Sequence, residues 1–408
     1  MERENEFLFY NGLDEISGMS DKSALTRRLV SFASEFGLEG NIWQQWLTYL
    51  IITDENGFSL ACERQSVKQD STLMELVMPD MAKFRELMAM EPVPQMSAYV
   101  SPYDAACGTE AGRLIAEMSD ALAAAEDDTS FASIVTEYYK DHGAGIYGLF
   151  KAFRIDPSSG SGLKLVPVTD GADVCFDDLI GYESQKQTLK ENTEAFVEGA
   201  YANNVLLYGD SGTGKSTSVH ALMHDYADRG LRLVEVSKPD RGRLSQILSE
   251  IKKRNYRFII FLDDLSFEEN ESDYKELKAM LEGALETRSD RVLIYATSNR
   301  RHLIRETWRD RNDMEYEGDV HRSDTMEEKL SLAARFGVSI YYPKPGPSEY
   351  YEIVRQLAER EGIELTGKDL DDAARKWELR HGGMTGRTAS QLITWLGGAA
   401  AEDETDNN

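Results

Sequence analysis

Residues 209–217, near the middle of the chain, have the types and spacing of a phosphate-binding loop and the start of its helix. Residues 209–216, GDSGTGKS, fit the Walker A pattern in full. Glycines let the backbone curl until successive N–H groups point inward at phosphate oxygens. The Lys215 ammonium would then reach the β- and γ-phosphates of a nucleotide, and the Ser216 hydroxyl would bind Mg²⁺. We therefore predict ATP and Mg²⁺ as cofactors, with the loop contributing Gly209, Asp210, Ser211, Gly212, Thr213, Gly214, Lys215, Ser216 and Thr217.

Two further apolar runs end in polar residues that belong beside such a loop. The run 258–262 is followed by Asp263 and Asp264, and Asp263 would hold the Mg²⁺ through water, as a Walker B aspartate does. Asp264 is the candidate general base, a role worth about 10²–10⁴-fold in rate. The run 292–297 leads to Asn299, which would orient the attacking water. The alternatives are a core strand that meets an acidic turn and a simple cap of a strand.

Two arginines complete the predicted catalytic set of Lys215, Asp264, Asn299, Arg335 and Arg387. Arg335 precedes the last apolar run of the sheet, and Arg387 opens a helix near the C-terminus. A guanidinium can neutralise charge on a transferring phosphoryl group and match its oxygens with paired donors. The alternative for each is an ordinary surface arginine.

The elements that must position these residues follow from the hydrophobic pattern. Short apolar runs alternate with helical patterns, which predicts a parallel sheet covered on both faces. The predicted strands are 205–208, 231–236, 258–262, 292–297 and 338–342, and the helices between them are 216–228, 243–253 and 274–286. Helical patterns at 350–360, 369–380 and 388–396 are too short to form a domain of their own and are interpreted as a lid on the sheet.

Composition divides the chain into parts. A Pro/Gly/Ser-rich stretch at 156–162 is typical of a linker. Before it, residues 1–155 carry helical patterns at 22–36, 73–90 and 111–125, and no catalytic motif is legible there. We therefore predict a mostly helical domain (1–155), a linker (156–162), an α/β core (163–345), a helical lid (346–397) and an acidic tail (398–408).

Several strings in 163–396 resemble a known family more specifically than a Walker motif does. The strings are 177–183, 202–209, 263–268, 295–303 and 328–331. They are similar to the AAA+ ATPase module of a bacterial family catalogued as domain of unknown function 815, which implies a P-loop NTPase sheet with a C-terminal helical lid. The resemblance implies that Leu179, Ile180 and Gly181 flank the adenine, that Asn299 is sensor 1 and that Arg387 is sensor 2. It also implies that Arg335 is an arginine finger for a neighbouring subunit, hence a ring or open-ring homo-oligomer.

One residue departs from the usual AAA+ pattern. Most members have Asp-Glu at the end of the Walker B strand, whereas the second acid here is Asp264, one methylene shorter. The shorter side chain places the base farther from the water, which would slow hydrolysis, and Glu268 is an alternative base. Because a general base contributes so much to the rate, this difference could separate a motor from a switch.

Charge and composition limit the classes of partner. The formal net charge is −27, which disfavours broad nucleic-acid binding, although local basic residues could still contact it. These residues are Lys238, Arg241, Arg243, Lys252, Lys253, Arg254 and Arg257, and the alternative is solvated surface charge. We expect no secretory signal and no membrane span, and the widely spaced cysteines favour a reducing cytoplasm.

Three functions are compatible with these observations. The first is an ATPase that drives conformational change and assembly of a protein or nucleoprotein partner, with a protein partner contacted through 1–155. The segment 236–243 lacks the aromatic residue of a polypeptide-threading pore loop, so threading is disfavoured. The second is a slowly hydrolysing switch that resembles helicase loaders and initiators and contacts nucleic acid. Small-molecule phosphotransfer is the third, and the paired acids with the lid arginine disfavour it.

Overall fold

The computed structural model describes residues 9, 21–64, 67, 71–102, 108–160, 162–169, 174–266, 277–278, 280–281, 290–299 and 332–405. The chain divides into two compact units. The first unit comprises Met1–Lys151 and the tripeptide Lys253–Asn255, and the second comprises Ala152–Lys252 and Tyr256–Asn408. The two units have separate hydrophobic cores, so each is described by itself.

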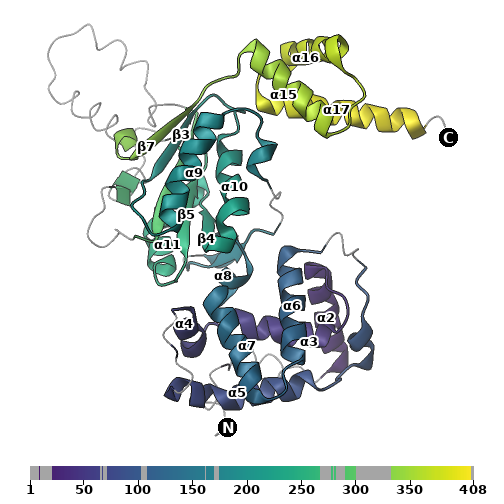
Figure 1. Ribbon diagram of the computed structural model, residues 1–408, viewed down its shortest axis with the longest axis vertical. Helices are drawn as coiled ribbons and strands as arrows, with labels where there is room; N and C mark the ends of the chain where they lie inside the picture. Colours follow the sequence, from purple (N-terminus) through teal and green to yellow (C-terminus); the bar gives the residue numbers. More distant parts are fainter. Residues whose placement is uncertain are drawn as a thin grey trace, which may run out of the picture. The chain divides into compact units, whose positions relative to one another are not determined.

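The first unit is helical, which confirms the predicted character of the N-terminal part. Its elements are α2 (Lys22–Phe36), α3 (Ile42–Thr53), α4 (Gly57–Glu63), α5 (Thr72–Met88), η1 (Pro94–Ala98), α6 (Glu110–Ala123), α7 (Asp128–Asp141) and α8 (Ile146–Leu149). Helix α3 buries residues on all of its faces and contacts α2, α5, α6 and α7, so it is the central helix of this unit (Figure 1). Side-chain N-caps begin these helices at Asp21, Asn41, Asn56, Ser71, Thr109 and Asp127.

The tripeptide Lys253–Asn255 buries one arginine in the first unit. The Arg254 side chain is 3% exposed, and its Nη2 lies 2.7 Å from Oε2 of Glu63, which is also 3% exposed. Its Nη1 lies 3.0 Å from Oε1 of Glu55, whose side chain is 37% exposed. Backbone groups complete the arrangement, because Arg254 donates to the Ala144 carbonyl and Glu63 accepts from the Asn255 N–H at 2.7 Å. We call Arg254, Glu55 and Glu63 the Arg254 cluster.

The second unit contains one seven-stranded sheet. Its strands are β1 (Ala152–Ile155), β2 (Leu165–Pro167), β3 (Val205–Gly209), β4 (Leu231–Glu235), β5 (Arg257–Leu262), β6 (Val292–Ser298) and β7 (Val338–Tyr342), in the order β2-β1-β4-β5-β6-β3-β7. All neighbouring strands are parallel except the β1–β2 pair. The predicted α/β parallel sheet is confirmed. The stretch 156–162 lies between β1 and β2, two strands that the sequence pattern did not indicate.

Both faces of the sheet are covered. Alternate strand residues such as Leu207, Ile259 and Tyr295 form one core with Leu189 of α9 (Glu183–Val197) and Leu222 of α10 (Lys215–Tyr226). Helices α9 and α10 lie together on that face (Figure 1). The intervening strand residues are buried as well, among them Leu206, Val234 and Ile260. Helix α11 (Leu244–Ile251) connects β4 to β5 through the 3₁₀ segment η6 (Lys238–Arg243). The predicted helix 274–286 lies largely outside the described residues.

The C-terminal part of the second unit is a three-helix lid. Its helices are α15 (Pro347–Arg360), α16 (Gly367–His381) and α17 (Gly386–Thr405), and these confirm the predicted C-terminal helices. They share a small core that includes Tyr350, Val354 and Leu392. Ile180 from the segment before α9 packs against this core, so the lid is joined to the rest of the second unit close to the expected adenine site.

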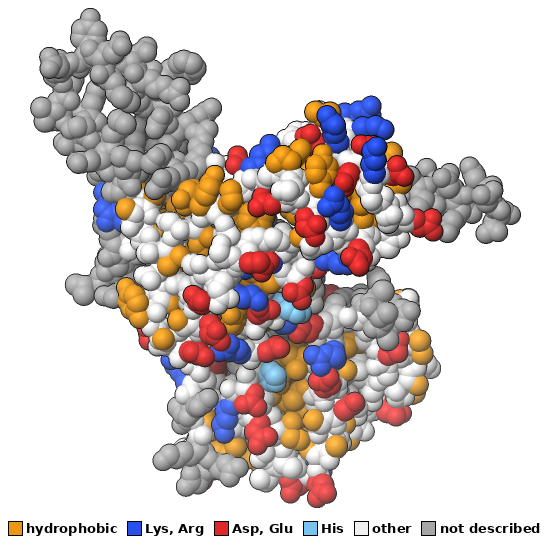
Figure 2. Space-filling view, turned by 45° about the horizontal axis from the view of Figure 1, so that its top comes forward, with side chains coloured by type: hydrophobic (Ala, Val, Ile, Leu, Met, Phe, Trp, Pro, Cys, Tyr) orange, Lys and Arg blue, Asp and Glu red, His pale blue; other side chains and the backbone are white. Residues whose placement is uncertain are grey.

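The surface mixes charges of both signs. Figure 2 shows acidic and basic side chains interspersed on the face in view, without a continuous basic face there. Among the helices that the structure describes, none combines the length and the apolar character needed to cross a bilayer.

Candidate nucleotide-binding site

The Walker A residues form the connection between β3 and α10. Gly209 (φ 142°) and Gly214 (φ 88°) have positive φ values, which side-chain-bearing residues rarely adopt. A Cβ on Gly209 would lie 2.0 Å from the Tyr342 carbonyl oxygen, and a Cβ on Gly214 would lie 2.5 Å from Cδ2 of Leu179. Both positions therefore favour glycine for their backbone conformation, and Gly209 also requires it for space because the close atom belongs to the backbone. The α10 N-terminus directly after the loop directs its positive dipole end at this place.

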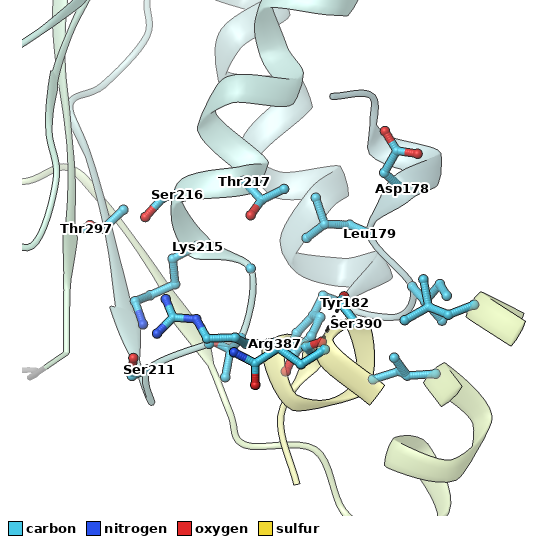
Figure 3. A pocket seen from close by; sticks show the side chains of 18 of the residues that line it. Asp178, Leu179, Tyr182, Ser211, Lys215, Ser216, Thr217, Thr297, Arg387 and Ser390 are labelled. Atoms are coloured by element: carbon cyan, nitrogen blue, oxygen red, sulfur yellow. Dashed lines mark hydrogen bonds between the residues drawn. The ribbon is translucent and has the colours of Figure 1, made fainter. Parts of the chain in front are cut away.

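A hollow of about 980 Å³ opens over the loop, at the carboxyl ends of the strands (Figure 3). This size suits a nucleotide, because ligand pockets run to about 1,000 Å³. Of the residues that we predicted to bind the cofactor, those that line it are Leu179, Ile180, Ser211, Gly212, Thr213, Gly214, Lys215, Ser216 and Thr217. Gly181, Gly209 and Asp210 are not among the lining residues. The lid completes the hollow with Ile353, Leu357, Arg387, Ser390, Gln391, Thr394 and Trp395.

Lys215 lies at the floor of this hollow with its ammonium among oxygen atoms. Its Nζ donates to the carbonyl oxygens of Gly209 and Asp210 at 2.9 and 2.6 Å, and to Oδ1 of Asn299 at 3.2 Å. Burial lowers the pKa of Lys215, and the nearby carboxylates of Asp210, Asp263 and Asp264 oppose that shift. The side chain is a buried cation whose acceptors are neutral, so an anionic phosphate would be a stronger partner.

The oxygen atoms expected around Mg²⁺ are close together. Asp263 Oδ1 accepts from Ser216 Oγ at 2.6 Å and from Thr297 Oγ1 at 2.5 Å. Mg²⁺ in phosphate-transfer sites takes one or two carboxylates, waters and substrate phosphates rather than a full protein cage. A hydroxyl and a carboxylate at the mouth of a phosphate loop fit that requirement. The described residues contain no group of three or more His, Cys, Asp or Glu side chains that could hold a metal ion.

Asp264 and Asn299 meet beside the Lys215 ammonium. Asn299 donates from Nδ2 to Oδ1 of Asp264 at 2.9 Å while its own Oδ1 accepts from Lys215. This follows from the strand order, because β6 lies between β5 and β3 and brings the ends of all three strands together. Both Asp264 and Asn299 are exposed to the hollow, where a water could reach them. The alternative base Glu268 lies outside the described residues.

The structure separates the two predicted catalytic arginines. Arg387 lies at the start of α17, lines the hollow, and donates its backbone N–H to the Gly212 carbonyl at 3.2 Å. Arg335 does not line it. Arg335 borders a second hollow of about 840 Å³ at the opposite end of the sheet, beside Asn204 and Val292 where β3 and β6 begin. Strands of five residues span about 17 Å, so Arg335 is far from the phosphate loop of its own chain.

Sequence reasoning missed several residues that the fold brings to the hollow. Thr297 binds Asp263 and also accepts the Asp264 N–H at 2.9 Å. The sequence feature that could have identified Thr297 is a polar residue near the end of an apolar strand. Asp178 and Tyr182 also line the hollow. Asp178 accepts from Arg360 of the lid at 2.6 Å, and its pKa is lowered by the Cys175 N–H first and by Arg360 in addition.

The basic residues proposed for nucleic-acid contact do not form one surface. Arg241 is 2% exposed and Arg254 is 3% exposed, so neither guanidinium is available to a phosphate backbone. Arg243 contacts the Gly162 carbonyl and Ser159. Lys238, Lys252 and Lys253 remain exposed. Some of the basic residues identified in the sequence are therefore buried in the fold.

Comparisons with known proteins agree with this description. A family model described as "Protein of unknown function (DUF815)" matches residues 149–400. Replication factor C large subunit of Methanococcus maripaludis strain C6 is 34% identical over 73 residues, which is 18% of this chain and 15% of that protein. Proteasome-activating nucleotidase of Methanothermobacter thermautotrophicus is 24% identical over 259 residues, 59% of this chain and 58% of that protein. The chain thus spans only part of the length of these curated relatives.

Solved structures give a weaker likeness. The Thermotoga maritima RuvB Holliday junction branch migration motor matches with a TM-score of 0.37 and 18% identity, covering 54% of this chain and 63% of that one. A TM-score that low carries no argument, so the fold is assigned from the strand order and the family match. Those two, with the distant AAA+ relatives, identify an AAA+ ATPase-like fold.

Proposed function

The chain belongs to the family described as "Protein of unknown function (DUF815)", and we propose that it binds and hydrolyses Mg-ATP. In this proposal hydrolysis drives or gates conformational change and assembly of a protein or nucleoprotein partner. The observation that carries it is the meeting of Lys215, Asp264 and Asn299 at one end of the sheet. Lys215 Nζ lies 3.2 Å from Oδ1 of Asn299, whose Nδ2 lies 2.9 Å from Oδ1 of Asp264. Three side chains from separate segments converge on the place where a γ-phosphate would lie.

Each group has a role in that chemistry. Lys215 and the loop N–H groups bind the phosphates, and Ser216 and Asp263 would hold Mg²⁺, which neutralises charge on the phosphoryl group. Asp264 would accept a proton from the attacking water. Asn299 would orient that water and the Asp264 carboxylate relative to each other. Arg387 would bring a positive charge from the lid to the phosphates.

The site is proposed to be completed by a second copy of the chain. Arg335 borders the opposite end of the sheet from the phosphate loop, so it cannot reach the nucleotide of its own chain. An arginine finger supplied by a neighbour in a ring or open ring would explain its place. The neighbour would insert the guanidinium only in the assembled form, so assembly would control turnover.

The direct test is Mg²⁺-dependent phosphate release by the full chain. We expect turnover that requires Mg²⁺ and rises with protein concentration as the oligomer forms. Asp264→Asn should retain ATP binding and lose turnover, and Asp240→Asn, a change in an acid outside the hollow, is its matched control. ATP binding without phosphate release at any concentration would contradict hydrolysis, and release only with an added acceptor would favour a phosphotransferase.

A slow switch is the second candidate, and the Asp264 side chain favours it. Its carboxylate is short and is already hydrogen-bonded by Asn299. In this candidate ATP sets the assembly state, and a partner reads that state. Replication factor C, which matches part of the chain, is named for replication, so DNA is the partner to test. Salt-dependent binding of single- or double-stranded DNA with ATP would support this candidate, and no binding at low salt would favour a protein partner.

A further inference from the structure

A buried arginine lies behind the Walker B turn without touching the hollow. Arg241 is part of η6, the 3₁₀ segment between β4 and α11, and its side chain is 2% exposed. It is absent from the residues that line the nucleotide hollow. Because a guanidinium keeps its charge in proteins and is costly to bury, the groups around it must compensate for lost water.

Backbone carbonyls of the Walker B turn are among the compensating groups. Arg241 Nη2 donates to the carbonyl oxygens of Asp263 at 3.0 Å and Asp264 at 3.3 Å. Nη1 lies 3.5 Å from the Ser266 carbonyl oxygen. The first two carbonyls belong to the peptide units on either side of the Asp264 Cα. A single nitrogen that binds both peptide units restrains how they rotate about that Cα.

The backbone at Asp264 needs such a restraint. Its φ is 47°, in the left-handed region, and among the described residues only Tyr182 shares a positive φ without being glycine. Aspartate tolerates this conformation better than most residues but does not prefer it, so the surroundings must hold it. On the other side of the turn, the Asp264 N–H donates to Thr297 Oγ1 at 2.9 Å and the Leu265 N–H donates to the Thr297 carbonyl at 2.7 Å.

We propose that Arg241 is a positioning residue for ATP hydrolysis, which acts by holding the left-handed backbone of Asp264. The inference rests on the proposed function. The left-handed turn directs the Asp264 carboxylate at Asn299, beside the Lys215 ammonium. Without the Arg241 donors the turn relaxes toward an ordinary conformation, and the carboxylate moves away from the water that it would activate.

The first test compares Arg241→Met with Arg241→Lys, and uses Arg243→Met as the matched control. Arg243 is the next arginine of the segment, and it contacts Ser159 and the Gly162 carbonyl instead of the Walker B turn. We expect Arg241→Met to lower kcat by about 10²-fold, as a misplaced catalytic group does, with ATP affinity changed by less than about threefold. Arg241→Lys keeps one donor and should lose less, and Arg243→Met should retain the wild-type kcat.

The second test asks whether Arg241 acts through Asp264. In an Asp264→Asn background, Arg241→Met should change the residual rate by less than about threefold, because the group that it positions is already disabled. An equal loss in both backgrounds, or an unchanged kcat in folded Arg241→Met, would overturn the inference. If Arg241→Met does not fold, Arg241→Lys with a wild-type kcat would overturn it. Absence of turnover in the wild type would instead contradict the proposed function, so the two failures are distinguishable.

Discussion

Two of the buried cations, one in each unit, lie in different surroundings. Lys215 in the second unit is 6% exposed and donates to two carbonyls and an amide oxygen. Arg254 in the first unit is 3% exposed and faces two carboxylates. Burial alone therefore does not distinguish a functional cation from a structural one.

The two cations differ in whether the groups that bind them also balance their charge. The three oxygen atoms that accept hydrogen bonds from Lys215 carry no charge, the carboxylates nearby do not bind it directly, and a hollow of about 980 Å³ stands open beside them. The charge of Arg254 is balanced by Glu63, which is itself buried and bound to backbone N–H groups. A buried cation beside open space and neutral acceptors can take an anion, whereas one that faces a buried carboxylate already has its counter-charge.

The largest expected effect separates the two cations most clearly. Lys215→Ala should weaken ATP binding by about 2–5 kcal/mol, roughly 30-fold or more, and abolish turnover, because it removes the partner of a buried phosphate charge. Titration calorimetry with Mg-ATP and a phosphate-release assay measure the two changes. Lys238→Ala, which removes an exposed lysine, is the control and should alter neither. Turnover that survives in Lys215→Ala would remove the basis for treating this cation as functional.

Arg335 extends the comparison to a cation that is proposed to act on the nucleotide of another copy. Arg335→Ala should leave ATP affinity within a fewfold of wild type and lower the turnover of the assembled form by about 10³-fold, the lower range for arginine fingers. Mixing Arg335→Ala with Lys215→Ala chains should restore activity, because some interfaces then combine an intact loop with an intact finger. If mixing restores nothing, action across subunits loses its support.

The third effect is on stability rather than on binding. Arg254→Ala leaves Glu63 buried without its counter-charge, which should cost about 3–5 kcal/mol in the first unit. Hydrogen exchange at the α7 amides should speed up, whereas the affinity of Mg-ATP at the second unit should stay as in the wild type. A large loss of ATP affinity in Arg254→Ala, with the second unit folded, would contradict the assignment of this cation as structural.

The smallest effect concerns the more exposed partner in the Arg254 cluster. Glu55 is 37% exposed, so Glu55→Gln should cost less than about 1 kcal/mol, as solvent-exposed pairs do. Chemical denaturation of Glu55→Gln, with Glu63→Gln beside it, measures the contrast. Equal losses in the two variants would indicate that burial does not set the strength of these pairs.

The sequence determined the parts of the site that are contiguous along the chain. A phosphate loop is a local structure, so residue types at fixed spacing were enough to place Lys215 and Ser216. The alternation of strands and helices predicted the parallel sheet, and the family resemblance implied the strand order that brings Asp264 to Asn299. The proposed role of Arg335 involves a second copy of the chain, which the fold of one chain does not describe.

Only the tertiary structure decided what Arg241, Thr297 and Arg254 do. In the sequence the two arginines read as surface charge, because nothing local distinguishes a guanidinium that is solvated from one that is buried. Arg241 meets a carbonyl 22 positions away, and Arg254 meets a carboxylate 191 positions away. The left-handed Asp264 was equally hidden, since a residue that tolerates two backbone conformations takes the one that its distant neighbours hold. The sequence by itself thus predicted a phosphate-binding loop, and the tertiary structure decided which cation faces the open hollow and which one faces a buried carboxylate.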